Sequence, residues 1–213
     1  MAEHDVDHHL SDDDGNIHTV WDNRLEPVLE VESGDVVRFE CRDANDAAIT
    51  HDTTLADLYD PPSTGHHMTG PVSVSNATPG DVLAVELLAF DHHGWGWTIF
   101  RPGELGFGLL PEDFPEPGMH IWDLEDDVGH FVDGIEVPLD PFPGVVGVAP
   151  AGPGEHPTAP PRDVGGNLDV KHLTAGSTIY LPVACEGALF SIGDGHAAQG
   201  DGEVSISAIE APM

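Results

Sequence analysis

The chain has 213 residues and a formal net charge of −33, because 39 Asp and Glu residues stand against only 6 Lys and Arg residues. A surface of this sign repels nucleic acid and anionic membranes, so we expect neither as a partner. Hydrophobic residues make up 39% of the chain, and no apolar stretch is long enough to cross a bilayer. These values predict a globular protein with its own core and exclude a membrane span.

The acidic residues are spread along the whole chain, and turn and strand signals persist among them, unlike in a disordered acidic tail. So many carboxylates repel one another in dilute buffer, whereas molar salt shortens the Debye length to about 3 Å. We therefore expect a halophilic protein that works in a high-salt cytoplasm. The N-terminal sequence MAEHDVDHHL lacks the basic and apolar regions of a secretory signal, in agreement with a cytoplasmic location.

Residues 1–20 form an acidic, His-containing N-terminal segment, and residues 21–213 are expected to form a single domain. The four histidines of the segment lack regular metal-ligand spacing, so we expect it to be mobile or to begin a strand. Cys41 and Cys185 stand in apolar runs and are expected to be buried free thiols.

Three stretches share the pattern of a Gly-containing turn followed by alternating apolar residues, which predicts a strand. They are Ser33–Cys41, Pro79–Phe90 and Thr174–Val183. Thr50–Tyr59 is the best helix candidate, with Asp52, Thr53 or Thr54 as its cap. Pro111–Pro141 is expected to form surface loops around one short strand, Met119–Leu124. The sequence therefore predicts a fold that is mainly β with a few short helices.

Two segments rich in Gly, Pro or Trp are expected to be loops. In Asp91–Leu110, the rings of Trp95, Trp97 and Phe107 either wall a pocket for a small substrate or fill a core that is short of large residues. Phe142–Pro150 begins a long irregular segment, a kind of segment that is usually functional in a compact domain.

Gly187–Glu210 carries the densest set of polar groups in the chain. Strands are predicted at Gly187–Ile192 and Val204–Ile209, and the loop between them contains five candidate site residues. These are Asp194, His196, Gln199, Asp201 and Glu203. The interspersed glycines allow tight turns and close approach to a ligand.

Four motifs resemble the acetamidase/formamidase family of amide hydrolases. They are GALFSIGDGHAAQGDGEV from Gly187, GGNLD from Gly165, PGVVGVAP from Pro143 and HMTGPVSVSNATPGDVLAVEL from His67. The resemblance implies a β-rich acetamidase/formamidase-like fold and hydrolysis of a small carboxamide. Chains of this family are usually longer, so we expect the C-terminal part of the fold to be incomplete. The chain would then act as a homo-oligomer or be completed by a further chain segment.

Amide hydrolysis needs an activated water, a stabilised oxyanion and a proton for the departing ammonia. The sequence has no Gly-x-Ser-x-Gly elbow, and its cysteines lack a polar context, so no nucleophilic side chain stands out. His and Asp residues in Gly-rich stretches instead suit a divalent cation, which lowers the pKa of bound water. A mixed imidazole and carboxylate set favours Zn²⁺, and Ca²⁺ is the all-oxygen alternative.

These considerations give one hypothesis for the site. The resemblance places His67 at the family's His-x-x-Thr-Gly-Pro position and raises Asp169 as a site residue, whereas the adjacent His66 should point to the opposite side. The expected metal ligands are His67, Asp169, Asp194 and His196. The expected catalytic acid–base residue is Glu203, with Asp201 as its substitute. The expected substrate-binding residues are Asn167, Gln199, Trp95 and Trp97. A non-catalytic protein that binds a divalent metal or a small ligand, and a structural subunit of a larger amidase, are the alternatives.

Overall fold

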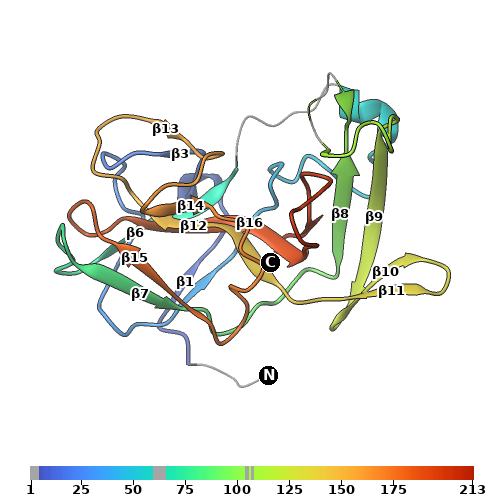
Figure 1. The fold of residues 1–213 in the computed structure, drawn as a ribbon. Helices are drawn as coiled ribbons and strands as arrows, with labels where there is room; N and C mark the ends of the chain where they lie inside the picture. The colour runs from blue at the N-terminus through green and yellow to red at the C-terminus, as the bar shows by residue number, and fades with distance from the viewer. Residues whose placement is uncertain (1–4, 60–65, 104–105, 107) are drawn as a thin grey trace.

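A computed structural model describes residues 5–59, 66–103, 106 and 108–213, so Phe107 lies outside the described residues (Figure 1). Short strands dominate, and the helices of the described part are two short 3₁₀ helices, η1 (Asp14–Asn16) and η2 (Leu55–Tyr59). The predicted fold class, mainly β with a few short helices, is confirmed. None of the described helices has the length and hydropathy needed to cross a membrane.

Short strands occur throughout the described part of the chain. They are β1 (His8–Leu10), β2 (Ile17–His18), β3 (Val20–Trp21), β4 (Leu29–Val31), β5 (Val37–Phe39), β6 (Met68–Val74), β7 (Val82–Glu86), β8 (Trp95–Phe100), β9 (Gly118–Glu125), β10 (Val128–Val132), β11 (Ile135–Pro138), β12 (Phe142–Val148), β13 (His156–Pro157), β14 (Gly165–Asn167), β15 (Thr178–Pro182), β16 (Phe190–Ala198) and β17 (Ile209–Glu210).

One sheet of eleven strands forms the frame of the protein. Its main path runs β11-β10-β9-β8-β17-β16-β12-β14, and β6 joins β16 to β2 and β4. Strand β16 is hydrogen-bonded to β12, β17 and β6, so it lies at the centre of this arrangement. Figure 1 shows β8 and β9 extending to one side of the body, with the β10–β11 hairpin at their outer edge.

In the described part of the chain, three two-stranded sheets accompany the large sheet, pairing β1 with β5, β3 with β13 and β7 with β15. The strands predicted by the repeated Gly-containing pattern are confirmed as β5, β7 and β15, and the last two pair with each other. Strands β1 and β2 of the N-terminal segment pair with β5 and β6, so strand pairing ties residues 8–18 to the body.

The prediction of an irregular segment at Phe142–Pro150 is wrong, because Phe142–Val148 forms strand β12. Every residue of β12 is buried, and the strand lies between β16 and β14. A strand that is buried on both faces does not alternate apolar and polar residues. Its sequence therefore lacks the pattern by which a half-buried strand is predicted. Val146 and Val148 join Phe190 and Ile192 of β16 in the largest core cluster.

Strand boundaries also differ in three other regions. The region Pro111–Pro141, predicted as surface loops around one strand, forms β9, β10 and β11, and the expected short strand is the inner part of β9. Asp91–Leu110, predicted as a loop, contains β8. The helix predicted at Thr50–Tyr59 is reduced to η2, whose short 3₁₀ form adds little backbone pairing.

The polar stretch after Phe190 is mostly strand, not loop. Strand β16 continues to Ala198, so Asp194 and His196 lie within it. The strand predicted at Val204–Ile209 shrinks to β17, because Glu203 and Ile206 have left-handed backbone angles (φ 43° and 56°) and belong to tight turns. The Ile206 amide donates a hydrogen bond to the Glu203 carbonyl at 2.8 Å, which closes one of these turns.

Candidate functional site

Asp194 and His196 project from β16 toward Gly144 of the neighbouring strand β12. A Cβ atom added at Gly144 would lie 2.5 Å from Asp194 Oδ2 and 2.9 Å from His196 Nε2. Only a glycine therefore leaves room for these two side chains. Asp194 also has a left-handed backbone (φ 58°), a conformation that Asp tolerates better than most residues.

Glu210 of β17 lies directly across from His196, because the two residues are register partners in the antiparallel pair. Glu210 Oε2 is 3.3 Å from His196 Nε2, and Asp194 Oδ1 is 3.5 Å from the same nitrogen. All three side chains are at most 4% exposed. Neither Asp194 Oδ1 nor Glu210 Oε2 has a hydrogen-bond partner among the described residues. Two buried carboxylate oxygens without a hydrogen bond, converging on an imidazole, form a cation-binding arrangement.

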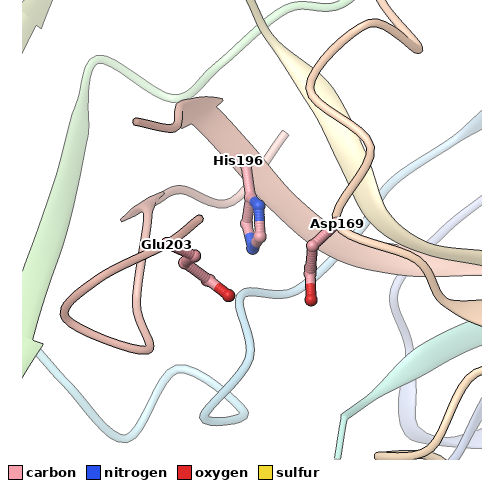
Figure 2. Close-up of side chains that lie close together, drawn as sticks. All are labelled: Asp169, His196 and Glu203. Carbon is pink, nitrogen blue, oxygen red and sulfur yellow. The ribbon is translucent and has the colours of Figure 1, made fainter. Parts of the chain in front are cut away.

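Asp169 and Glu203 approach His196 from two other segments (Figure 2). One ligand atom from each of these three residues lies within 4.8 Å of the other two. Figure 2 shows the two carboxylates on either side of the His196 ring, directed into the same space. The turn at Asp169 is held by the Gly144 carbonyl, which accepts hydrogen bonds from the Leu168 and Asp169 amides at 2.9 and 3.2 Å.

Both carboxyl groups on this more open side of His196 have pKa values above their ordinary ones. The pKa of Glu203 is raised to about 7, mainly because the side chain is buried and also because the charge of Asp169 lies nearby. Burial, then the charge of Asp194, raises the pKa of Asp169 as well. A carboxyl group with a pKa near 7 can both accept and return a proton at neutral pH, which is what a general acid–base catalyst requires.

The buried side of the site is a strongly coupled set of charges. Burial alone would lower the pKa of His196, but Glu210 and Asp194 outweigh it and raise that pKa well above its usual range. Burial raises the pKa of Glu210 more than His196 lowers it. For Asp194, the charges of His196 and His66 outweigh burial, so its pKa is lowered and it stays ionised. This half of the site therefore favours a bound positive charge.

His66 and His67 exchange the places that the sequence predicted for them. His66 Nε2 lies 3.9 Å from Asp194 Oδ2, and its Nδ1 lies 3.1 Å from the Thr158 hydroxyl. His67 Nε2 lies instead 3.5 Å from Asp46 Oδ2, and His67 joins neither of the two groups of potential metal ligands found in the described part of the chain. The two residues do point in different directions, as expected for neighbours in an extended segment, but His66 is the one that faces the site.

Asp201 points away from the cluster. Its side chain is 92% exposed, and its Oδ1 pairs with Lys171 Nζ at 2.5 Å. The turn that directs Glu203 toward His196 directs Asp201 into solvent, although only two positions separate them. The geometry therefore gives Asp201 no contact with the groups around His196.

The four residues expected to bind substrate occupy different environments. Gln199 joins His196 Nδ1 to the Asp169 carbonyl, with both contacts at 3.0 Å. Asn167 Nδ2 donates to the Ala159 carbonyl, while its buried Oδ1 has no hydrogen-bond partner in the described regions. Trp97 is 2% exposed and belongs to a core cluster, as the core-filling alternative predicts. Trp95 is half-buried, with its ring centroid 4.7 Å from that of His51.

Glu210 is the site residue that sequence reasoning missed. It follows an alternating stretch and resembles many other acidic positions in a chain with 39 of them. Its partner, His196, is adjacent only through the β16–β17 register. The signal that could have revealed it is the apolar run around it, because a lone carboxylate within a buried strand needs a partner.

The fold and these motifs define a family. The sequence matches the Acetamidase/Formamidase family over residues 3–154 and 151–212, so the chain belongs to that family. It is 31% identical to a formamidase from Methylophilus methylotrophus, over 95% of this chain and 63% of that protein. It is 29% identical to an acetamidase from Mycolicibacterium smegmatis, over 94% of this chain and 65% of that protein.

Solved structures show the same relationship. A crystal structure of an acetamidase from Bacillus halodurans matches with a TM-score of 0.86 and 34% identity, over 96% of this chain and 67% of that one. A gamma lactamase from Delftia acidovorans matches with a TM-score of 0.87 and 30% identity, over 94% and 62% of the two chains. The β-rich acetamidase/formamidase fold is therefore confirmed, and the chain spans less than two thirds of the length of the curated relatives named above.

Proposed function

We propose that this chain carries the catalytic site of an amidase that hydrolyses a small aliphatic carboxamide, such as formamide or acetamide, to the carboxylate and ammonia. The observation that carries the proposal is the placement of Glu203, with a pKa of about 7, beside Asp169 and His196. Membership in the Acetamidase/Formamidase family supports the same reaction class.

The proposal includes a divalent cation, Zn²⁺ in preference to Ca²⁺. The buried residues fit such an ion, because Asp194 Oδ1 and Glu210 Oε2 lack hydrogen-bond partners in the described chain and lie within 3.5 Å of His196 Nε2. An imidazole among the donors favours Zn²⁺ over Ca²⁺. Asp194, His196 and Glu210 would hold the ion. When bound, a divalent cation lowers the pKa of water and polarises a carbonyl group.

The remaining steps fall to residues around the open side. Glu203 removes a proton from the attacking water and returns it to the departing amine, because its pKa lies near neutral pH. The unpaired Oδ1 of Asn167 is an acceptor that suits the N–H of a carboxamide substrate. Cys41 is a poor candidate for a covalent nucleophile, because burial raises the pKa of its thiol to about 12.

Ammonia release from formamide and acetamide, with zinc content measured on the same sample, tests the proposal. Glu203→Gln should retain zinc and lower kcat by about 10²–10⁴, the usual contribution of one general acid–base group. Glu112→Gln, at an exposed position, is the matched control. Zinc binding without ammonia release from either amide would favour the binding-protein alternative, and full activity of Glu203→Gln would overturn the role of Glu203.

A further inference from the structure

The side chain of Gln199 lies between the two halves of the site. Its Nε2 donates a hydrogen bond to the Asp169 backbone carbonyl at 3.0 Å, and its Oε1 lies 3.0 Å from His196 Nδ1. Both polar ends of this amide are therefore engaged by the protein. This use differs from the substrate-binding role that the sequence predicted for Gln199.

The backbone carbonyl determines the direction of the whole chain of hydrogen bonds. A carbonyl oxygen can only accept, so the end of the Gln199 amide that faces Asp169 must be the NH₂ group. The end that faces His196 is then the amide oxygen, which also can only accept. His196 Nδ1 must therefore carry a hydrogen, whatever the state of Nε2.

We propose that Gln199 is a positioning residue that keeps a proton on His196 Nδ1 and so directs Nε2 toward Asp194 and Glu210. This proposal rests on the proposed function, because the two carboxylates and Nε2 are taken to hold a metal ion. Nε2 is the nitrogen that lies 3.3 Å from Glu210 Oε2 and 3.5 Å from Asp194 Oδ1. With Nδ1 protonated, a neutral His196 presents its lone pair at Nε2, where these two carboxylates converge.

The same side chain also couples two segments that are far apart in sequence. Asp169 lies in a turn after β14 with a left-handed backbone (φ 47°), and its carbonyl is held by Gln199 from the end of β16. The Gly144 carbonyl also holds this segment, through the Leu168 and Asp169 amides, so removing the Gln199 hydrogen bond should loosen the position of the Asp169 carboxylate without releasing the segment. Gln199 thus sets the orientation of the His196 ring and the position of Asp169 together.

Long-range ¹H–¹⁵N NMR on protein labelled with ¹⁵N-histidine tests the proposal directly. The signals of His196 are identified by their loss in His196→Asn. We expect Nδ1 of His196 to be protonated in both the metal-free and the zinc-loaded wild-type chain. An unprotonated Nδ1 in the wild-type chain would mean that the amide is reversed and would overturn the proposal.

Two substitutions at Gln199 separate the acceptor from the donor. Gln199→Met keeps the length of the side chain but removes both hydrogen bonds, so the His196 ring should lose its fixed orientation and Zn²⁺ affinity should fall by about 10–100-fold, the usual effect of losing the partner of a ligating histidine. Gln199→Glu retains an acceptor, so the Nδ1 proton should remain while the Asp169 carbonyl loses its donor. Val204→Ala, at an exposed position of the same segment, is the control.

A Gln199→Met chain with unchanged Zn²⁺ affinity would also overturn the proposal. The NMR readout in the metal-free chain does not depend on amide turnover. If the wild-type chain bound zinc, kept the Nδ1 proton and released no ammonia, the proposed function would fail while the role of Gln199 in positioning His196 would stand.

Discussion

His196 and Glu210 face each other across two antiparallel strands, with Nε2 and Oε2 3.3 Å apart in an environment that excludes water. Neither group would be stable there as an isolated charge, because burial of an unpaired ion is costly. Asp194 adds a second carboxylate to the same nitrogen. This pairing sets the electrostatics of the site and suggests the first experiment.

Glu210→Gln should leave the metal-free chain folded but remove its stabilisation by zinc. Burial raises the pKa of Glu210, which brings the metal-free side chain close to a neutral, amide-like state. In the wild-type chain, a ligand that binds only the folded state adds about 2.7 kcal/mol at 100 times its Kd. Thermal unfolding with and without Zn²⁺ measures this difference. An equal zinc-induced shift of Tm in both chains would contradict the assignment of Glu210 as a ligand.

Gly144→Ala should close the site from the side of β12. The added methyl group would lie 2.5 Å from Asp194 Oδ2 and 2.9 Å from His196 Nε2, so both side chains must move. Overpacking of this kind costs about 1–3 kcal/mol of stability, and Zn²⁺ binding should be lost. Gly200→Ala is the matched control, because nothing lies within 4 Å of a Cβ atom there. Calorimetric Zn²⁺ titration of both variants gives the answer, and wild-type affinity in Gly144→Ala would show that the ion binds elsewhere.

The stability of the metal-free chain should fall as pH rises through the region where Glu203 titrates. The pKa of Glu203 is about 7 in the folded chain and 4.5 ordinarily, so between these values the folded state holds a proton that the unfolded state has released. The contribution of Glu203 to the free energy of unfolding is therefore fully present below pH 4.5 and is lost as pH rises through about 7. Glu203 is not fully buried, so we expect on the order of 1–2 kcal/mol rather than the full value for such a shift.

The comparison of wild type with Glu203→Gln isolates this contribution. Gln does not titrate, so for the Glu203→Gln variant the unfolding free energy should fall less steeply between pH 4.5 and 7 than it does for the wild-type chain. Denaturant unfolding in metal-free buffer measures both curves. Parallel curves would mean that Glu203 keeps an ordinary pKa, and the acid–base role would lose its main support.

Cys41 should resist alkylation in the folded chain. Burial raises its pKa to about 12 from the usual 9.0. Because only the thiolate reacts, the reactive fraction falls by about 10³ at pH 8 even before access is considered. Mass spectrometry after iodoacetamide treatment at native and denaturing conditions would show protection of Cys41 that disappears on unfolding. Rapid modification of Cys41 in the native chain would argue against its burial.

Salt should stabilise the folded chain over a wide range of concentrations. With a formal charge of −33, the compact state brings many carboxylates close together, and they repel one another. Molar salt shortens the Debye length to about 3 Å and so screens this repulsion. Tm measured by circular dichroism should therefore rise steadily from 0.1 M to 3 M KCl, concentrations chosen to span weak and strong screening. A constant Tm across this range would contradict the halophilic prediction.

Much of the architecture could be predicted from local sequence alone. The Gly-containing turns that precede β5, β7 and β15 follow directly from backbone geometry, so these strands were predicted near their true positions. Asp194 and His196 could be singled out as candidates from the dense polar groups in this Gly-rich stretch, although the sequence predicted a loop there and the structure places both residues within β16. The family could be recognised from the same motifs.

Other features depended on contacts between distant segments. Strand β12 reads as an irregular stretch because it is buried on both faces and has no alternation to mark it. Glu210 reaches His196 only through the register of β17 on β16, and nothing local distinguishes it from the other acidic residues. The direction of Glu203 inward and Asp201 outward follows from a tight turn in which Glu203 has a left-handed backbone.

The sequence by itself determined a mainly β chain, its family, and Asp194 and His196 as candidate site residues, because these depend on local patterns and motifs. That both residues lie within a strand was decided by the tertiary structure. Tertiary structure alone decided that His66 rather than His67 faces Asp194, and that Gln199 supports His196. The physical reason is that a side chain's partner is set by strand register and turn geometry. Those are fixed by packing across the whole sheet and not by the residues on either side.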